Sequence, residues 1–258
     1  MKVAVFGDPM RDVYWVGTAD RLSPEAPLPV VKVQEKLEFP GGAANVAAGL
    51  EALGVEVEKF YYPLGCPVKN RLVVGNYQLA RWDESDECHE NNTAARLDDV
   101  DAVVVSDYGK GGITYPVWQN ILDSGKPLFV DTKGSPIGWW TLDNRAIVFP
   151  NHKEYQEQQD YVGFKLCVLK QGAHGLSLLS YGKEWLHCPA RAKRVVSVNG
   201  AGDTVLAAFV YKYLLNGGQE SMANRAAVWA NAAAAVAVGK PYTSTVSREE
   251  VERFIGDG

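Results

Sequence analysis

The stretch DAVVVSDYGKG, residues 101–111, joins a run of apolar, mostly β-branched residues to a polar loop that contains glycine. Three other stretches repeat this plan: KVAVFGD (2–8), KPLFVDTKG (126–134) and RAIVFPN (145–151). Strands that are apolar on both faces are typical of a parallel sheet covered by helices on both sides. Helix-length segments, such as 42–53 and 113–124, lie between these strands, so the alternation predicts an α/β fold with βαβ crossovers.

Length and composition limit the classes of function. The chain has 258 residues, of which 47% are hydrophobic and 22% charged, and we interpret it as one domain spanning 1–258. Its net charge of −5 and the absence of a lysine- or arginine-rich block argue against a nucleic-acid partner. No apolar run is long enough to cross a membrane, and the first residues do not form a signal peptide, so we expect a cytoplasmic protein without a membrane partner.

Two stretches interrupt the strand–helix alternation. Residues 13–39 and 68–83 read as extended antiparallel strands, and the prolines at 24, 27 and 29 exclude a helix in the first of them. A small β-sheet that projects from the α/β body would account for both. Such a sheet could be a lid or a dimer surface; the alternative is an edge hairpin that lies flat on the core.

Polar residues gather where the predicted strands end. In parallel α/β sheets, ligands bind beyond the carboxyl ends of the strands. The residues at those ends are Asp8, Asp107, Lys110, Asp131, Lys133 and Asn151. Their shared position makes each of them a candidate site residue.

A second candidate site lies in SVNGAGDTVLAAF, residues 197–209. From Val205 onward the apolar residues follow helical spacing, so Gly200, Ala201, Gly202 and Asp203 stand at a helix N-terminus. Free N–H groups and the helix dipole make such a terminus an anion site. The motif alone also fits a plain turn with Asp203 as a helix cap, and the spacing leaves both interpretations open.

The order of several motifs along the chain is more specific than any one of them. The set comprises GGAANVAAGLEALG (41–54), SDYGKG (106–111), FPNHKE (149–154), LKQGAHG (169–175) and NGAGDT (199–204). Together they resemble the ribokinase-like family of carbohydrate kinases. Further stretches resemble its heptose 7-phosphate kinase branch: GDPMRDVYW (7–15), RLSPEAPLPVVKV (21–33), NYQLARWD (76–83), VDTKG (130–134) and VGKPYTSTVS (238–247).

This resemblance implies a ribokinase-like fold with a β-sheet lid and assigns roles to matching residues. Asp203 resembles the catalytic base, with Gly200, Ala201 and Gly202 as the anion hole. The sugar site would comprise Asp12, Gly41, Gly42 and Asn45. The nucleotide site would comprise Asn151, Glu154, Lys170, Gly172, Gly175 and Asn231. Asn151 and Glu154 would also hold Mg²⁺, through water, and hard oxygen donors suit that ion.

The implied reaction is ATP-dependent phosphorylation of the anomeric hydroxyl of a heptose 7-phosphate, giving the 1,7-bisphosphate used in nucleotide-heptose biosynthesis. Arg81, Lys110 and Lys133 would bind the 7-phosphate, unless they are plain surface charges. Two copies would pair through the lid sheet. Alternatives are another ribokinase-like sugar or nucleoside kinase, or a catalytically silent module that binds a sugar or nucleotide.

Three features depart from the family pattern. Only about a dozen residues, 55–67, separate the LEALG helix from the return strands of the lid, and a second shortening follows Glu154. Ser197 stands where many relatives have an aspartate that helps to hold a monovalent cation. The departures predict a trimmed fold and leave potassium activation open.

Overall fold

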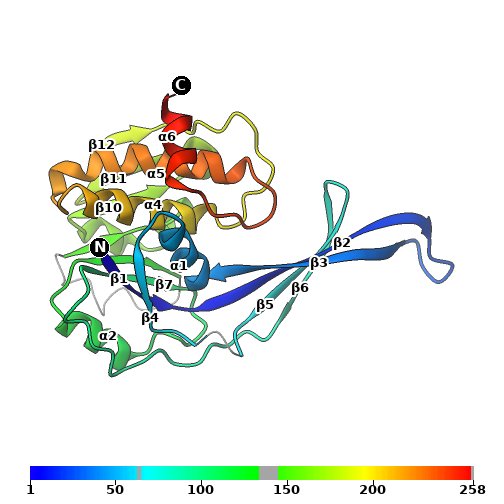
Figure 1. Ribbon diagram of the computed structural model, residues 1–258, viewed down its shortest axis with the longest axis horizontal. Coiled ribbons are helices and arrows are strands. Elements are labelled where there is room, and N and C mark those ends of the chain that lie inside the picture. Colours follow the sequence, from blue (N-terminus) through cyan, green and yellow to red (C-terminus); the bar gives the residue numbers. More distant parts are fainter. Residues whose placement is uncertain (63–64, 134–144, 257–258) are drawn as a thin grey trace.

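The computed structural model describes residues 1–62, 65–133 and 145–256, and it has two sheets (Figure 1). A large sheet lies between helical layers, and a small sheet projects from one side of this body. No helix of the described residues is long and apolar enough to cross a membrane. The predicted α/β fold with a projecting β-sheet is confirmed.

The large sheet has eight strands in the order β12-β11-β10-β9-β8-β7-β1-β4. Their bounds are β1 Lys2–Gly7, β4 Glu56–Lys59, β7 Ala102–Asp107, β8 Leu128–Thr132, β9 Ala146–Val148, β10 Leu166–Lys170, β11 Leu176–Ser180 and β12 Lys183–Cys188. The six strands from β4 to β10 are parallel, and β11 and β12 continue the sheet antiparallel. The carboxyl ends of β7, β8 and β10 therefore meet at one edge. The loop residue Gly134 after β8 lies outside the described residues.

Helices cover both faces of the large sheet, as the apolar strands require. Helices α1 (Ala43–Ala52), α4 (Ala201–Leu215), α5 (Ala223–Val238) and α6 (Arg248–Gly256) share one core with Val3 and Val5. Helix α2 (Tyr115–Asp123) packs on the other face with Ala4 and Phe6. Successive residues of β1 thus enter opposite cores, which explains why that strand is apolar throughout.

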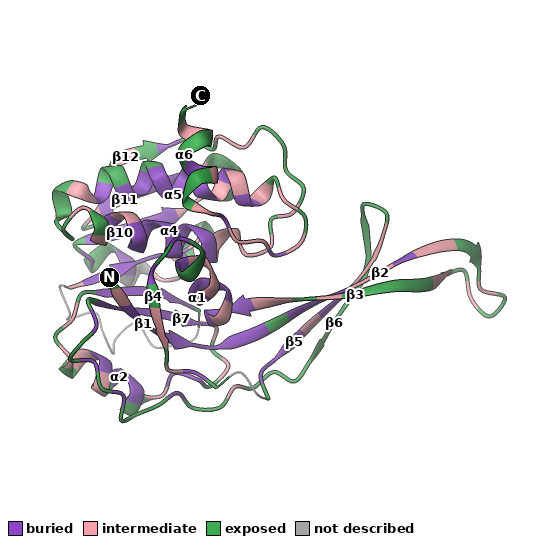
Figure 2. Cartoon of the chain, viewed as in Figure 1, coloured by how far each residue is buried: buried purple, intermediate pink, exposed green. Residues whose placement is uncertain are grey.

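The small sheet contains β2 (Pro9–Leu22), β3 (Pro29–Gly42), β5 (Val68–Val74) and β6 (Tyr77–Glu84) in the order β3-β2-β5-β6. Both hairpins are antiparallel, as predicted, but β2 and β5 join them with parallel pairing. Buried residues lie at the base of the sheet and its far part is mostly exposed (Figure 2), while the edge strand β6 is exposed along its whole length. The sheet is therefore a projection and does not lie flat on the core.

Candidate active site

Helix α4 begins beside the edge where the strands of the large sheet end. Its N-cap, Gly200, has a left-handed backbone with φ of 73°. A Cβ at this position would lie 2.6 Å from Asn45 Nδ2, so only glycine fits without a shift of the neighbouring side chain. The turn leaves the first N–H groups of α4 without partners within the helix. It also puts Asp203 in the first helical turn.

Asp203 is buried but well bonded. Its side chain accepts a hydrogen bond from Asn45 Nδ2 (2.9 Å to Oδ2) and one from the Tyr108 hydroxyl (2.8 Å to Oδ1). Burial raises the pKa of Asp203, while the two hydrogen bonds lower it. Burial and the neighbouring carboxylates raise the pKa of Tyr108, so this phenol stays protonated and donates. Asp203 is therefore a fixed carboxylate with its proton affinity raised by burial, which suits a general base.

A cavity of about 320 Å³ opens beside Asp203. Its lining combines the start of α4 with strand ends: Tyr108, Asp131, Lys133, Asn151, Lys170, Gly172, Val198, Gly200, Ala201, Gly202 and Asp203. Lys170 Nζ pairs with Asp131 Oδ2, and Asp131 Oδ1 is buried with no hydrogen-bond partner among the described residues. The predicted convergence of strand-end residues is thus seen for Asp131, Lys133 and Asn151.

A second cavity, of about 360 Å³, adjoins the first through shared residues such as Lys170 and Gly202. Its walls are mostly aliphatic and come from the loop after β10, from the segment before α4, and from α4 and α5. They include Gly172, Gly175, Val195, Val198, Val205, Ala234, Ala235 and Val238. Asn231 also lines it, and its Nδ2 donates to the carbonyl of Pro189 at 2.8 Å. An elongated ligand could place a flat apolar end here and its charged end at the start of α4.

Asn151 and Glu154 form a capping box at helix α3 (His152–Glu157). The Asn151 side chain accepts from the Glu154 backbone N–H at 2.9 Å, and Glu154 Oε2 accepts from the Asn151 backbone N–H at 2.8 Å. Burial raises the pKa of Glu154. Within the described ranges, no three His, Cys, Asp or Glu side chains form a metal-binding group. The unpartnered Asp131 oxygen suits a Mg²⁺ ion that takes its other ligands from phosphates and water, whereas both Glu154 oxygens accept from Asn151, so Glu154 would act through water.

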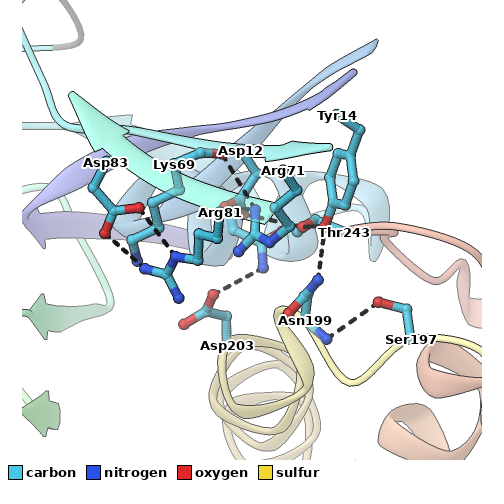
Figure 3. Close-up of polar contacts among 11 residues, drawn as sticks. Asp12, Tyr14, Lys69, Arg71, Arg81, Asp83, Ser197, Asn199, Asp203 and Thr243 are labelled. Carbon is cyan, nitrogen blue, oxygen red and sulfur yellow. Dashed lines mark hydrogen bonds and ion pairs between the residues drawn. The ribbon is translucent and has the colours of Figure 1, made fainter. Parts of the chain in front are cut away.

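The small sheet faces Asp203 and carries a buried ion pair between Asp12 and Arg71 (Figure 3). Asp12 on β2 accepts from Arg71 Nη1 on β5 at 2.7 Å, and both side chains are more than nine-tenths buried. Thr243 also donates to Asp12, and the Gly41 backbone lies against the same carboxylate. Asp12 and Gly41 are thus brought together, Asn45 bonds to Asp203, and Gly42 is the residue that precedes α1.

The cations predicted to bind a distal phosphate are not equivalent. Lys110 pairs with Asp86 and does not line the cavity, and Arg81 makes two hydrogen bonds to Asp83, at 3.0 and 2.7 Å. Lys133 Nζ lies 3.7 Å from the centre of the Tyr108 ring, with no carboxylate ion pair among the described residues. Lys133 is therefore the cation of this set whose charge is least neutralised by the protein itself.

Sequence reasoning missed Lys69 and Tyr108. Lys69 Nζ lies 5.1 Å from the centre of the Tyr108 ring, and the described residues offer it no carboxylate ion pair. Burial lowers the pKa of Lys69, as do the nearby Lys133 and Arg81. Lys69 and Arg71 are two apart on β5, so they share one face. The alternate spacing of Lys69 and Arg71 was the signal available in the sequence, and the structure adds that Lys69 is paired in register with Asp12 on β2.

Two predicted strand-end acids shape the loop that carries Tyr108. Asp8 accepts from the backbone N–H groups of Tyr108, Lys110 and Gly112, at 2.7, 3.0 and 2.8 Å. Asp107 accepts from the backbone N–H of Gly109 at 2.8 Å and from the Thr132 hydroxyl at 2.7 Å. Their contribution is to hold the loop in place, because their acceptor atoms are taken by the protein itself.

Sequence comparisons relate this chain to known carbohydrate kinases. Residues 140–250 match the family model described as pfkB family carbohydrate kinase. The chain is 34% identical, over 98% of its length, to the bifunctional protein HldE of Shewanella sediminis and to that of Vibrio cholerae. It spans 63% of the length of each relative. The alignment with the first runs over 308 positions, so that relative carries segments which this chain of 258 residues lacks.

Solved structures share the fold at low sequence identity. Ribokinase from Thermotoga maritima has a TM-score of 0.71 and 17% identity, with 99% of this chain and 98% of that chain covered. Phosphofructokinase-2 from Escherichia coli has a TM-score of 0.72 and 16% identity, with 100% and 98% covered. Ribokinase from Arabidopsis thaliana, solved with ribose and ATP, has a TM-score of 0.67 and 17% identity, with 98% of each chain covered.

Proposed function

We propose that the chain is a member of the pfkB family of carbohydrate kinases, whose model residues 140–250 match, and that it phosphorylates the anomeric hydroxyl of a heptose 7-phosphate with ATP. The product would be the 1,7-bisphosphate, made in the cytoplasm for nucleotide-heptose biosynthesis. One observation carries the proposal: buried Asp203 lines the cavity at the start of α4, and its hydrogen-bond partner Tyr108 lies against Lys69 of the small sheet.

Asp203 would act as the general base. As the sugar oxygen forms its bond to the γ-phosphorus, the carboxylate takes the hydroxyl proton and the bond to the ADP oxygen breaks. A positioned base contributes roughly 10²–10⁴-fold to such a step. The N–H groups of Gly200, Ala201 and Gly202 would stabilise charge on the transferred group, because they lie at the start of α4.

The donor would lie in the aliphatic cavity and reach with its phosphates into the adjoining one, whose part beside Tyr108 and Lys133 would be left to the acceptor. Its base would lie among the aliphatic walls by Asn231, and its phosphates would reach Lys170, Gly172 and the start of α4. Asp131 and Glu154 would hold Mg²⁺ directly or through water, together with Asn151. The ion would neutralise phosphate charge when bound. A monovalent cation is not part of this proposal.

The acceptor would lie under the small sheet, which acts as a lid. Asp12, Asn45 and the Gly41–Gly42 backbone would bind sugar hydroxyls. Lys133 and Lys69 would bind the distal phosphate, and what supports this is that neither has a carboxylate partner among the described residues. Lys110 and Arg81 would contribute less, because Asp86 and Asp83 already neutralise them.

The test is ATP turnover against matched pairs of phosphorylated and free sugars, including heptose 7-phosphate, fructose 6-phosphate and ribose. We expect heptose 7-phosphate to have the highest kcat/KM and the free sugars to be poor acceptors. Equal use of phosphorylated and free sugars would favour a general sugar or nucleoside kinase. Ligand binding without any ADP formation would favour a silent binding module.

The lid would also pair two copies of the chain. Strands β3 and β6 are the edges of the small sheet, and its exposed side chains include Val33, Tyr77, Leu79 and Trp82. Open edges and exposed apolar faces favour association. Light scattering at micromolar concentration should give the mass of a dimer, and a monomer would contradict this part of the proposal.

A further inference from the structure

A chain of hydrogen bonds joins the acceptor side of the site to the loop before α4 (Figure 3). Asn199 Nδ2 lies 2.9 Å from the Tyr14 hydroxyl, which lies 3.2 Å from Thr243 Oγ1. Thr243 Oγ1 lies 3.0 Å from Asp12 Oδ2. The four side chains come from β2, from the loop before α4 and from the segment between α5 and α6.

The direction of this chain is fixed by its two ends. An amide nitrogen only donates, and an ionised carboxylate only accepts. The Thr243 hydroxyl therefore gives its proton to Asp12, and Tyr14 in turn gives its proton to Thr243 and accepts from Asn199. A chain with one direction weakens at every step when a middle member is removed, because neighbouring hydrogen bonds polarise one another.

Burial and ring packing hold the middle of the chain in place. Tyr14 and Thr243 are each only 3% exposed. The Tyr14 ring lies 4.7 Å from that of Tyr242 and 5.7 Å from that of Phe39, centre to centre. Tyr242 adopts a left-handed backbone with φ of 59°, which a tyrosine keeps only where surrounding contacts enforce it. The loop that carries Thr243 is thus fastened to the small sheet.

The two ends of this hydrogen-bond chain lie at the donor half and the acceptor half of the site. Asn199 directly precedes Gly200, the N-cap of α4, whose N–H groups would receive the transferred phosphoryl group. Thr243 approaches the same glycine, since its Cγ2 would be 3.0 Å from a Cβ there. Asp12 would bind a hydroxyl of the acceptor.

We propose that Tyr14 and Thr243 are positioning residues that couple acceptor binding to donor binding. An acceptor hydroxyl that bonds to Asp12 would fix the Thr243–Tyr14–Asn199 chain and, through it, the loop that presents the N–H groups of α4. Bound acceptor would then tighten donor binding, and by linkage the donor would tighten acceptor binding by the same factor. The inference rests on the proposed kinase function.

The test measures binding of a non-hydrolysable ATP analogue with and without saturating heptose 7-phosphate. The wild-type chain should bind the analogue at least about fivefold more tightly when the acceptor is present. Thr243→Val removes the hydroxyl and keeps the shape. It should abolish this increase and leave the affinity for the analogue alone unchanged. Tyr14→Phe should behave alike, and the double variant should be no worse than either single one.

Thr245→Val is the matched control, because it removes a hydroxyl from the same segment, but one that does not belong to the hydrogen-bond chain. It should keep the full increase, and all variants should unfold within a few degrees of the wild type. The inference is overturned if the wild type shows no increase or if Thr243→Val keeps it. It is also overturned if Thr243→Val weakens the analogue equally with and without acceptor. Because binding is measured without turnover, a failed acceptor panel would contradict the proposed reaction separately.

Discussion

The donor side and the acceptor side of the site meet at the start of α4 and are built differently. The donor cavity has mostly aliphatic walls, and its Asn231 side chain already bonds to the Pro189 carbonyl. The acceptor side carries a buried ion pair between Asp12 and Arg71 and two lysines beside one tyrosine ring. One side therefore offers shape, and the other offers charge and directed hydrogen bonds.

This difference predicts where the site is selective. Apolar walls discriminate between ligands by only roughly 10- to 200-fold, whereas sites that hydrogen-bond a ligand reject analogues without the bonding group far more strongly. Removing one member of a buried polar pair is also costly, because its partner is left unsatisfied. Substitutions on the acceptor side should therefore alter turnover more than substitutions or ligand changes on the donor side.

The largest effect should come from Asp203→Asn. The amide keeps the size of the side chain but cannot take the hydroxyl proton, so kcat should fall at least ~10²-fold. Donor binding should stay nearly unchanged. Single-turnover ADP formation with heptose 7-phosphate, together with binding of an ATP analogue, measures both.

Asp86→Asn is the control for this substitution, since Asp86 is exposed and pairs with Lys110. It should keep turnover within about twofold of the wild type. Residual activity of Asp203→Asn within a few-fold of the wild type would remove Asp203 from the role of base.

A smaller effect is expected at the distal phosphate. Lys133→Ala removes one charge-assisted hydrogen bond, which is worth about 1.5–3 kcal/mol, or roughly ten- to a hundredfold in kcat/KM. Only the phosphorylated acceptor should be affected, and Lys69→Met should act in the same way. Lys110→Ala is the control and should change kcat/KM less than about threefold. Equal losses for Lys110 and Lys133 would contradict the distinction between paired and unpaired lysines.

Much of the fold could be predicted because strand and helix periods are local. The stretches 2–8 and 101–111 contain β1 and β7, and Gly200 stands at the start of α4, as predicted. The parallel pairing of β2 with β5 could not be predicted in this way. Alternation along one strand does not specify its neighbour, and this contact joins segments that are distant in sequence.

The site was predicted less evenly. Gly200 and Asp203 lie together because a glycine turn at a helix start also fixes the position of the first helical residues. Asn45, from α1, bonds to Asp203. Lys110 lies after a strand as Lys133 does, but Asp86, from a loop without regular structure, pairs with it. Such a pairing depends on tertiary placement of a loop, and neither period nor spacing encodes it.

The Tyr108 hydroxyl should tune the base. Its hydrogen bond lowers the pKa of Asp203, so Tyr108→Phe should raise that pKa. A bond of about 1.5 kcal/mol corresponds to about one pH unit. Since the base works only when ionised, kcat/KM rises as pH rises through this pKa, and in the variant the rise should occur at higher pH. Kinetics from about pH 4 to about pH 8 measure the shift; Tyr115→Phe, at an exposed tyrosine of α2, is the control.

The smallest effect should be on the choice of donor base. Asn231 is a polar side chain of the donor cavity, and its Nδ2 is committed to Pro189, so few side-chain groups remain to distinguish the edge of adenine from that of guanine. ATP and GTP should therefore differ in kcat/KM by no more than a few-fold, below the roughly 10- to 200-fold limit of apolar pockets. The same preparation should separate heptose 7-phosphate from its free sugar by at least about tenfold. Rejection of GTP by more than about a hundredfold would contradict the contrast between the two sides, because the donor side would then be as selective as the acceptor side.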